Sequence, residues 1–364
     1  MANVIMMLTN SFDPDLRVYK EALYLTQQGH SVEILCWDRD ARYRDRPKEE
    51  MDGIRIRRFF IESQYGSGLK QVTGLMAFGR ACKQYLRAVD YQYMHCHDLD
   101  GMLAGCVAND AGAKMIFDMH EFYESGTYAK IKPIVRRVVS ALQSKAYRVI
   151  YLNDQQKERV KPKNLEKLVY LPNYPQRDLM GPFVRVPSDT LRVNYIGSVR
   201  DYKSLRMLCD AAKGLEGVSV GIHGMGTAYQ ALQKLQPQYP NLQVTGRYNG
   251  LTESSALFAH TDLLYCVYDI AQPNWRTAIP LKVYEGALTC TPVVVSRDSK
   301  VELLVQRYDA GFSVDCNDTA ALRELLTALR DDRSRLAAKA EHMKNIQYRF
   351  TWEQIVENLK AIYG

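Results

Sequence analysis

Short apolar runs alternate with amphipathic helical patterns along almost the whole chain, and this alternation limits the fold more than any other feature. In the first half it predicts strands at 4–8, 32–37, 54–61, 93–97, 114–118 and 149–152, and helices at 15–28, 66–89, 101–111 and 131–147. Alternation of this kind is typical of βαβ units, in which helices cover both faces of a parallel sheet.

The alternation pauses over about 173–188, where prolines and glycine gather, and it then resumes. In the second half it predicts strands at 191–197, 218–223, 242–244, 262–267 and 292–296, and helices at 203–215, 280–289, 319–330, 333–343 and 352–363. A pause of this composition indicates a linker between domains. A chain of 364 residues is also longer than the ~250–300 residues that one core usually serves.

We therefore predict an α/β protein with two Rossmann-like doubly wound domains that face a central cleft. The first domain is expected at 1–175, joined by a closing helix at about 350–364, and the second at 188–349. Open parallel sheets bind ligands beyond the carboxyl ends of their strands, so both domains should present binding loops there.

Composition narrows the setting in which the chain works. Its 48 Lys and Arg against 41 Asp and Glu give a net charge of +7, which suits an anionic ligand or membrane surface and does not require nucleic acid. No apolar stretch reaches the ~18 residues of a membrane span. The N-terminus is interpreted as a first strand and not as a signal peptide, and the eight cysteines form no CxxC pair. We expect a cytoplasmic protein without disulfides.

Residues 278–288 read AIPLKVYEGAL and predict a loop that enters a helix. Pro280 suits the first turn, and the free amides around Ile279 and Leu281, with the helix dipole, favour an anion. Lys282 and Glu285 are three residues apart and share one helix face, where a carboxylate could accept both hydroxyls of a ribose. A capped surface helix with a Lys–Glu pair is the alternative.

A second motif follows the first strand of the second half. Gly197 allows close approach of the backbone, and Arg200 and Lys203 precede or open the next helix, as suits a diphosphate. A solvated basic turn would look the same in sequence. The His223-Gly224 pair ends the next strand and is a weaker signal, equally consistent with a tight βα turn.

Two polar clusters end strands of the first half. His97, Asp98 and Asp100 follow one strand, and His120 and Glu121 follow the next. A zinc site, a polar sugar-binding rim, and helix N-capping by Asp98 and Asp118 are all compatible with these residue types. Neither cluster has the ligand spacing typical of zinc, so no metal site is predicted.

In order and spacing, these segments resemble the GT-B glycosyltransferases, specifically glycosyltransferase family 4, a retaining family. The resemblance covers essentially the whole chain. The matching segments are DLRV at 15–18, GHSV at 29–32, HDLD at 97–100, DMHE at 118–121, LPN at 171–173, YIG at 195–197, Lys203, HGMG at 223–226, and residues 280–285 and 292–296.

The resemblance implies a role for each motif. Glu285 would bind the ribose of a nucleoside-diphosphate sugar, with a UDP-sugar favoured and a GDP-sugar the alternative. Lys203, helped by Arg200 and the amides near 278–281, would hold the leaving diphosphate, so no metal is required. His120 would lie near the donor sugar or the acceptor hydroxyl. The remaining predicted contacts are Gly197, Ser198, His223, Gly224, Thr277, Ile279, Pro280, Leu281 and Lys282 for the donor, and Asn10, Ser11, Arg17, His97, Asp98, Asp100 and Glu121 for the acceptor.

Three positions depart from the family pattern. Thr277 stands where many members have the first of two glutamates, and Ser198 stands where a basic residue usually follows the strand-end glycine. Asn10 and Ser11 lie in a loop where the family usually has two glycines, and either residue is a candidate for the work of that loop.

The acceptor implied by the resemblance is a glycan, a lipid-linked sugar or a cell-surface polysaccharide precursor. The segments 66–89 and 131–147 are basic and amphipathic, so they suit contact with the inner face of an anionic membrane. Packing of their apolar stripes on the sheet is the alternative. A nucleotide-sugar 2-epimerase of the same fold and a non-catalytic fold member are the competing functions. A dehydrogenase is disfavoured, because no G-x-G-x-x-G follows the first strand.

Overall fold

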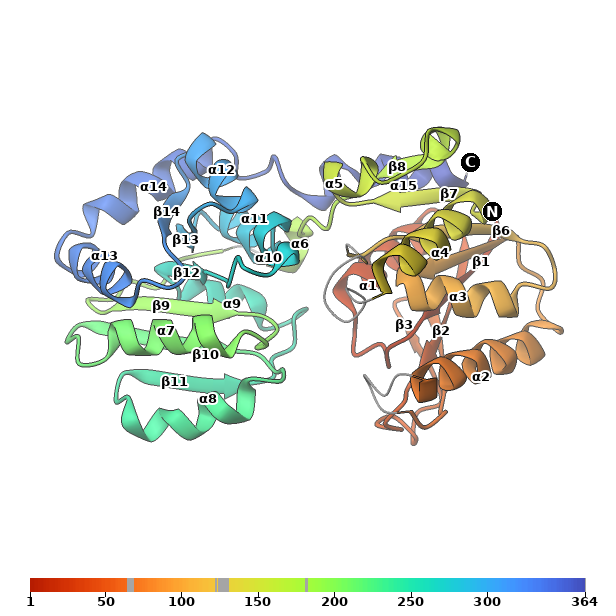
Figure 1. The fold of residues 1–364 in the computed structure, drawn as a ribbon, viewed down its shortest axis with the longest axis horizontal. Helices are drawn as coiled ribbons and strands as arrows, with labels where there is room; N and C mark the ends of the chain where they lie inside the picture. Colours follow the sequence, from red (N-terminus) through yellow and green to blue (C-terminus); the bar gives the residue numbers. More distant parts are fainter. Residues whose placement is uncertain (64–68, 122, 124–130, 181–182, 364) are drawn as a thin grey trace. The chain divides into compact units, whose positions relative to one another are not determined.

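The computed structural model describes residues 1–63, 69–121, 123, 131–180 and 183–363. The chain divides into two compact units. Unit 1 consists of Met1–Asn173 together with Ile355–Gly364, and unit 2 consists of Tyr174–Gln354. Each unit is built around its own sheet (Figure 1).

Unit 1 contains an eight-stranded sheet in the order β3-β4-β2-β1-β5-β6-β7-β8. All neighbouring strands are parallel except β3 and β4, which form an antiparallel edge. The strands are β1 (Asn3–Leu8), β2 (Ser31–Trp37), β3 (Lys48–Met51), β4 (Ile54–Phe59), β5 (Tyr93–His97), β6 (Lys114–Asp118), β7 (Arg148–Tyr151) and β8 (Leu168–Tyr170).

Helices cover this sheet because their apolar faces are buried against it. Trp37 of β2 stacks on Phe78 of α2, with ring centroids 5.7 Å apart, inside a core that also takes in α3 and α4. The C-terminal helix α15 belongs to the same unit, since Asn358 donates a hydrogen bond to the carbonyl of Tyr170 in β8 (Figure 1). The helices are α1 (Leu16–Gln27), α2 (Leu69–Leu86), α3 (Asp98–Ala108), α4 (Lys132–Lys145), α5 (Asp154–Lys157), η2 (Pro162–Lys167) and α15 (Val356–Tyr363).

Unit 2 contains a six-stranded, wholly parallel sheet in the order β11-β10-β9-β12-β13-β14. Two buried clusters pack helices onto it. One includes Leu208 of α7 (Tyr202–Ala212) and Leu322 of α13 (Thr319–Asp331), and the other includes Phe258 of α9 (Ser254–Ala259) and Val301 of α12 (Lys300–Arg307). The strands are β9 (Leu191–Ile196), β10 (Val218–His223), β11 (Leu242–Gly246), β12 (Leu263–Cys266), β13 (Val293–Ser296) and β14 (Gly311–Val314).

The helices of unit 2 are mostly short. They are α6 (Arg177–Met180), α7 (Tyr202–Ala212), α8 (Tyr229–Leu235), η3 (Gln236–Gln238), α9 (Ser254–Ala259), α10 (Pro273–Thr277), α11 (Leu281–Leu288), α12 (Lys300–Arg307), α13 (Thr319–Asp331), α14 (Ser334–Lys344) and η4 (Trp352–Gln354). Part of the stretch predicted as a linker is fixed to this unit. Arg185 donates hydrogen bonds to the carbonyl of Thr261 and, over 2.8 Å, to the hydroxyl of Thr291.

The predicted α/β class with two parallel-sheet domains is confirmed. In both sheets the order of successive strands reverses at the first strand. The neighbours of β1 are β2 and β5, and the neighbours of β9 are β10 and β12. Loops at such a switch point leave an opening beyond the carboxyl ends of the strands, where open α/β sheets bind ligands. None of the helices in the described ranges is long and apolar enough to cross a bilayer, and all eight cysteines are free thiols.

Candidate functional site

The switch point of the unit 1 sheet is polar. Asn10 and Ser11 follow β1 and line a hollow of about 350 Å³, together with Asp38 and Arg39, which follow β2. The Asn10 amide is held by Asp15, 3.1 Å away, and Asp15 also caps α1 by accepting from the amides of Arg17 and Val18. Asp15 therefore fixes the loop after β1 to the start of α1. The hollow beside this loop is a candidate acceptor subsite.

Asp118, at the end of β6, is fully buried and is the centre of an ion network in unit 1. Its carboxylate accepts two hydrogen bonds from Arg17, at 2.9 and 2.6 Å, in a bidentate pair. It also accepts from His97 at 3.1 Å and from His120 at 2.8 Å. Arg17 in turn donates to the carbonyl of Leu171, which ties β6, α1 and the chain after β8 together.

This network sets the charge of His120, whose side chain is 22% exposed. Burial alone would lower the pKa of His120, but the charge and hydrogen bond of Asp118 raise it to about 9. Burial would raise the pKa of Asp118, yet Arg17 and His120 hold it well below its usual range. His120 is therefore a cation at neutral pH. Because the Nε2–H group of His120 already donates to Asp118, only its Nδ1–H group is left to donate to a ligand. His120 is therefore suited to donating a hydrogen bond and not to accepting a proton.

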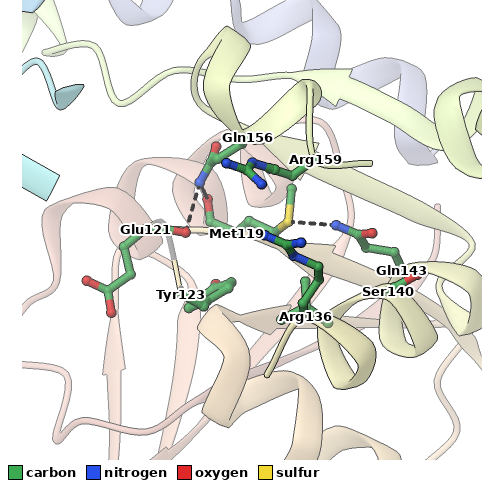
Figure 2. A pocket seen from close by; sticks show the side chains of 9 residues that line it. Met119, Glu121, Tyr123, Arg136, Ser140, Gln143, Gln156 and Arg159 are labelled. Atoms are coloured by element: carbon green, nitrogen blue, oxygen red, sulfur yellow. Dashed lines mark hydrogen bonds between the residues drawn. The ribbon is translucent and has the colours of Figure 1, made fainter. Parts of the chain in front are cut away.

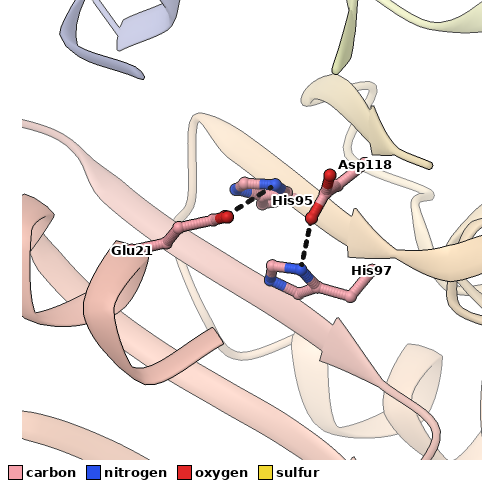
Figure 3. A group of neighbouring side chains, drawn as sticks. All are labelled: Glu21, His95, His97 and Asp118. Atoms are coloured by element: carbon pink, nitrogen blue, oxygen red, sulfur yellow. Dashed lines mark hydrogen bonds and ion pairs between the residues drawn. The ribbon is translucent and has the colours of Figure 1, made fainter. Parts of the chain in front are cut away.

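Glu21 and His95 extend the network on its inner side, and with His97 and Asp118 they form a buried group whose ligand atoms lie within 4.8 Å of one another (Figure 3). Such a group could hold a metal ion. However, the Arg17 guanidinium already pairs with Asp118 and lies 3.3 Å from Glu21, so a cation occupies this position. Burial raises the pKa of Glu21, which favours its neutral form beside His95. We read the group as an internal ion network.

The capping interpretation of Asp98 and Asp118 is wrong. His97 is the N-cap of α3, Asp98 accepts from the amide of the next residue, and the Asp118 carboxylate is committed to Arg17 and the two histidines. Asp98 instead adopts a left-handed backbone with φ of 67°, so the chain turns sharply where β5 becomes α3. Asp100 lies in the first turn of α3, 3.9 Å from Arg39.

Glu121 lies beside a small hollow of about 40 Å³ within unit 1, lined also by Arg136 of α4 and by Arg159 (Figure 2). Gln156 donates 3.2 Å hydrogen bonds to the carbonyls of Met119 and Glu121, which fixes the backbone after β6. The Glu121 carboxylate is exposed and points away from the other labelled side chains (Figure 2).

In unit 2 the two strand-end glycines meet. Gly197 follows β9 with φ of 138°, Gly224 follows β10 with φ of 139°, and the Gly197 amide donates to the carbonyl of His223 over 2.9 Å. A side chain at Gly224 would lie 1.8 Å from the carbonyl oxygen of Gly197, so only glycine fits. His223 is buried and bonds to Thr245 at 2.9 Å, and burial lowers its pKa, so it is neutral there.

The predicted basic residues lie just beyond Gly197. Ser198 and Arg200 are exposed, and Lys203 lies in the first turn of α7. The Lys203 ammonium is 58% exposed and pairs with Asp269, 3.3 Å away in the loop after β12. This pair bridges the ends of β9 and β12, which are the two strands of the switch point. A diphosphate at this edge would meet Lys203 directly.

The loop after α10 brings the third predicted segment to the same sheet. Pro280 is the N-cap of α11, one position earlier than predicted, Leu281 opens the helix, and Ile279 packs against the buried cluster of Phe258 and Val301. The Thr277 hydroxyl donates to the carbonyl of Pro273 in its own helix. Thr277 therefore does not point its hydroxyl freely, as its predicted role would require.

Glu285 is half-buried, one turn into α11. Burial raises the pKa of Tyr248, and the charge of Glu285 adds to this effect, so these two side chains are neighbours. Tyr248, His223 and Thr245 line a polar hollow of about 850 Å³ in unit 2, larger than the others named above. This hollow is the candidate nucleotide pocket.

Sequence reasoning missed Glu21 and Asp269, although each is one step from a predicted residue. Glu21 lies one helical turn after Arg17, which is the ion-pair spacing of a helix, and that signal was available. Asp269 follows a strand that the alternation predicted, but its pairing with Lys203 depends on strand order, which spacing does not reveal.

The comparisons with known proteins agree with this architecture. Residues 16–174 match the family model described as "Glycosyl transferase 4-like domain". A 94-residue stretch is 29% identical to D-inositol 3-phosphate glycosyltransferase of Corynebacterium kroppenstedtii, which covers 26% of this chain and 21% of that enzyme.

Solved structures align over nearly the whole chain at low identity. Sucrose-phosphate synthase from Thermosynechococcus elongatus has a TM-score of 0.79 at 16% identity, covering 100% of this chain and 98% of that one. HepE from Anabaena, solved with UDP-glucose, has a TM-score of 0.71 at 16% identity, covering 99% and 100%. The chain therefore shares the GT-B fold of these structures, and its residues 16–174 are similar to the glycosyl transferase 4-like domain.

Proposed function

We propose that the chain is a retaining glycosyltransferase, which moves a hexosyl or N-acetylhexosaminyl group from a nucleoside-diphosphate sugar to a glycan, lipid-linked or cell-surface polysaccharide acceptor. The bond between the anomeric carbon and the diphosphate oxygen breaks, and a bond to the acceptor oxygen forms with the same anomeric configuration. The acceptor proton leaves with the diphosphate. UDP-sugars are the favoured donors, in line with the UDP-glucose bound by HepE of the same fold.

The observation that carries this proposal is the placement of Lys203, Gly197 and the start of α11 at the switch point of the unit 2 sheet. A diphosphate is suited by this combination of a switch point, a glycine that lets a ligand approach the protein backbone, a lysine and a helix N-terminus. Preorganised donors at a developing anion are usually the largest catalytic contribution, with a single donor worth roughly 10²–10³ in rate. No metal is needed if this site supplies the positive charge.

Within the proposal, Glu285 accepts hydrogen bonds from the ribose, and the hollow lined by Tyr248 and His223 takes the base. Lys203 exchanges Asp269 for the diphosphate, with Arg200 beside it as an exposed second cation. The role expected of Thr277 is weakened, because its hydroxyl is already donated to its own helix.

Unit 1 is proposed to bind the acceptor. Asn10 and Ser11 line its polar hollow, and Asp98, Asp100 and Glu121 offer further acceptors at the same edge of the sheet. His120 is proposed to donate a hydrogen bond to the reacting sugar or acceptor, since it is a cation at neutral pH. Arg17 and His97 are buried behind it, so we now assign them to holding Asp118 and not to binding the acceptor.

Contact with an anionic membrane on the cytoplasmic side also belongs to the proposal. Ile131 and Ile134 at the start of α4 are 46% and 59% exposed, beside the exposed Lys132, Arg136 and Arg137. Exposed apolar side chains among basic ones are what an interfacial helix presents to anionic lipid. A lipid-linked acceptor would be met at that surface.

Donor turnover tests the proposal directly. The chain is incubated with UDP- and GDP-sugars, with and without EDTA, and release of the nucleoside diphosphate is measured in the presence of a panel of glycan and lipid-linked acceptors. We expect one donor to turn over, insensitively to EDTA, with a product of unchanged anomeric configuration. An inverted product would refute retention alone. Absence of turnover with every donor, from a chain that binds a nucleoside diphosphate, would favour a non-catalytic member of the fold.

A further inference from the structure

Lys282 is a buried lysine whose ammonium has no hydrogen-bond partner among the described residues. Its side chain is 6% exposed, and across the described part of the chain no atom accepts a hydrogen bond from its ammonium nitrogen. Glu285, three residues along the same helix, does not accept one either. Buried polar groups in folded proteins are almost always hydrogen-bonded, so this exception calls for a physical explanation.

An aromatic ring holds the ammonium in place. The Lys282 nitrogen lies 3.2 Å from the ring centroid of Tyr195 and 5.7 Å from that of Tyr268. The Tyr195 hydroxyl donates a 2.6 Å hydrogen bond to the carbonyl of Ser198, so the same side chain also fixes the loop after β9. A ring face attracts a cation, but it supplies neither a hydrogen-bond acceptor nor a counter-charge.

The ammonium also lies directly beside the predicted diphosphate position. A Cβ built at Gly197 would lie 3.2 Å from the Lys282 nitrogen, so this nitrogen faces the turn that ends β9. Gly197 stands at the switch point between β9 and β12, where open sheets bind their ligands. Lys282 itself occupies the first turn of α11, whose free amides and dipole favour an anion at the same place.

We propose that Lys282 is the buried counter-charge for the diphosphate of the donor, and that Tyr195 is its positioning residue. Ser198, directly after Gly197, carries no charge, and Lys282 supplies one to the same turn from α11. A lysine ammonium is a compact point charge suited to phosphate oxygens. This inference rests on the proposed function, and it adds the source of the positive charge that replaces a metal.

The burial of the Lys282 charge predicts that one substitution raises stability and lowers affinity. A buried ammonium without a hydrogen-bond acceptor destabilises the unliganded fold, and an apolar replacement of similar size removes that cost. Lys282→Met should therefore raise the melting temperature of the unliganded chain by about 2 °C or more. The same variant should lower the affinity for the nucleoside diphosphate at least ~10-fold. A lysine with a merely structural role would show the opposite pair of effects.

Binding is measured by calorimetry with UDP, GDP, ADP, the matching nucleoside and inorganic pyrophosphate. The variants are Lys282→Met, Tyr195→Leu and, as the matched control, Lys234→Met on the exposed surface of α8. We expect the first two variants to bind the diphosphate and pyrophosphate more weakly and to bind the nucleoside with unchanged affinity. The double variant should bind the diphosphate only slightly more weakly than either single variant. The control should bind as the wild type does.

Each outcome decides a different claim. If the wild type binds a nucleoside diphosphate and Lys282→Met binds it equally well, or if this variant melts lower or fails to fold, the role of Lys282 is refuted and the proposed function stands. If Tyr195→Leu leaves diphosphate affinity unchanged, Tyr195 does not position Lys282. If the wild type binds none of the diphosphates, the proposed function and this inference both fall.

Discussion

Replacing Asp118 by asparagine should destabilise unit 1 strongly, because the variant keeps the shape of the side chain and removes its charge. Arg17 and His97 would remain buried, and Arg17 would lose the carboxylate that it meets at 2.6 Å. Breaking a buried ion pair by removing one partner typically costs about 3–5 kcal/mol.

The magnitude can be worked independently through His120. Its pKa is about 9 in the folded chain against an ordinary value of 6.5. Since one pKa unit corresponds to about 1.4 kcal/mol, folding stabilises the protonated form of this mostly buried ring by about 3 kcal/mol in total, with the charge and hydrogen bond of Asp118 outweighing the cost of burial. The pKa is raised on folding, so this contribution is complete below about pH 6.5 and is lost as the pH rises through about 9.

Hydrogen–deuterium exchange of peptides from β5 and β6 measures the stability of unit 1 alone. We expect Asp118→Asn to speed their exchange at least ~100-fold at neutral pH. The matched control is Asp110→Asn, which breaks an exposed ion pair with Lys83 and should change stability by less than about 1 kcal/mol. Equal exchange in Asp118→Asn and the control, or an NMR titration that gives His120 an ordinary pKa, would refute the reasoning.

Four further outcomes are expected. Glu285→Gln should weaken the nucleoside diphosphate at least ~10-fold by calorimetry, and unchanged affinity would remove Glu285 from the ribose site. Lys203→Ala should reduce turnover by at least ~10²-fold, and near-normal turnover would exclude it from holding the leaving group. His120→Gln should reduce transfer while nucleotide affinity stays close to that of the wild type; if affinity collapses instead, His120 is structural. Ile134→Ser should lower sedimentation with vesicles that contain anionic lipid, and equal sedimentation of variant and wild type would argue against α4 as the contact.

The alternation of strands and helices was sufficient to predict the central strands of both sheets, because the hydrophobic pattern is local and strands such as β1 and β9 are buried along most of their length. Short edge elements such as β3 and β14 were missed, since Lys48–Met51 is charged and only partly buried and three of the four residues of Gly311–Val314 are only half-buried. The single helix predicted at 352–363 is divided into η4 and α15.

For the site, too, local features could be predicted from the sequence and long-range pairings could not. Residues next to strand ends, such as Gly197 and His120, could be found from the chain, because parallel strands bring their carboxyl ends to one edge. Pairings across the sheet could not be found. Arg17 with Asp118 and Lys203 with Asp269 each join elements that are distant in sequence, and only the strand order brings them together.

The central claim is that the switch point of unit 2 binds a nucleoside diphosphate without a metal. Calorimetry of UDP, GDP and ADP against the wild type and Glu285→Gln, each with magnesium and with EDTA, tests it most directly. We predict that one diphosphate binds at one site per chain with the same affinity in magnesium and EDTA, and that Glu285→Gln weakens it. Binding of none of the three, or binding only with magnesium, would contradict the account.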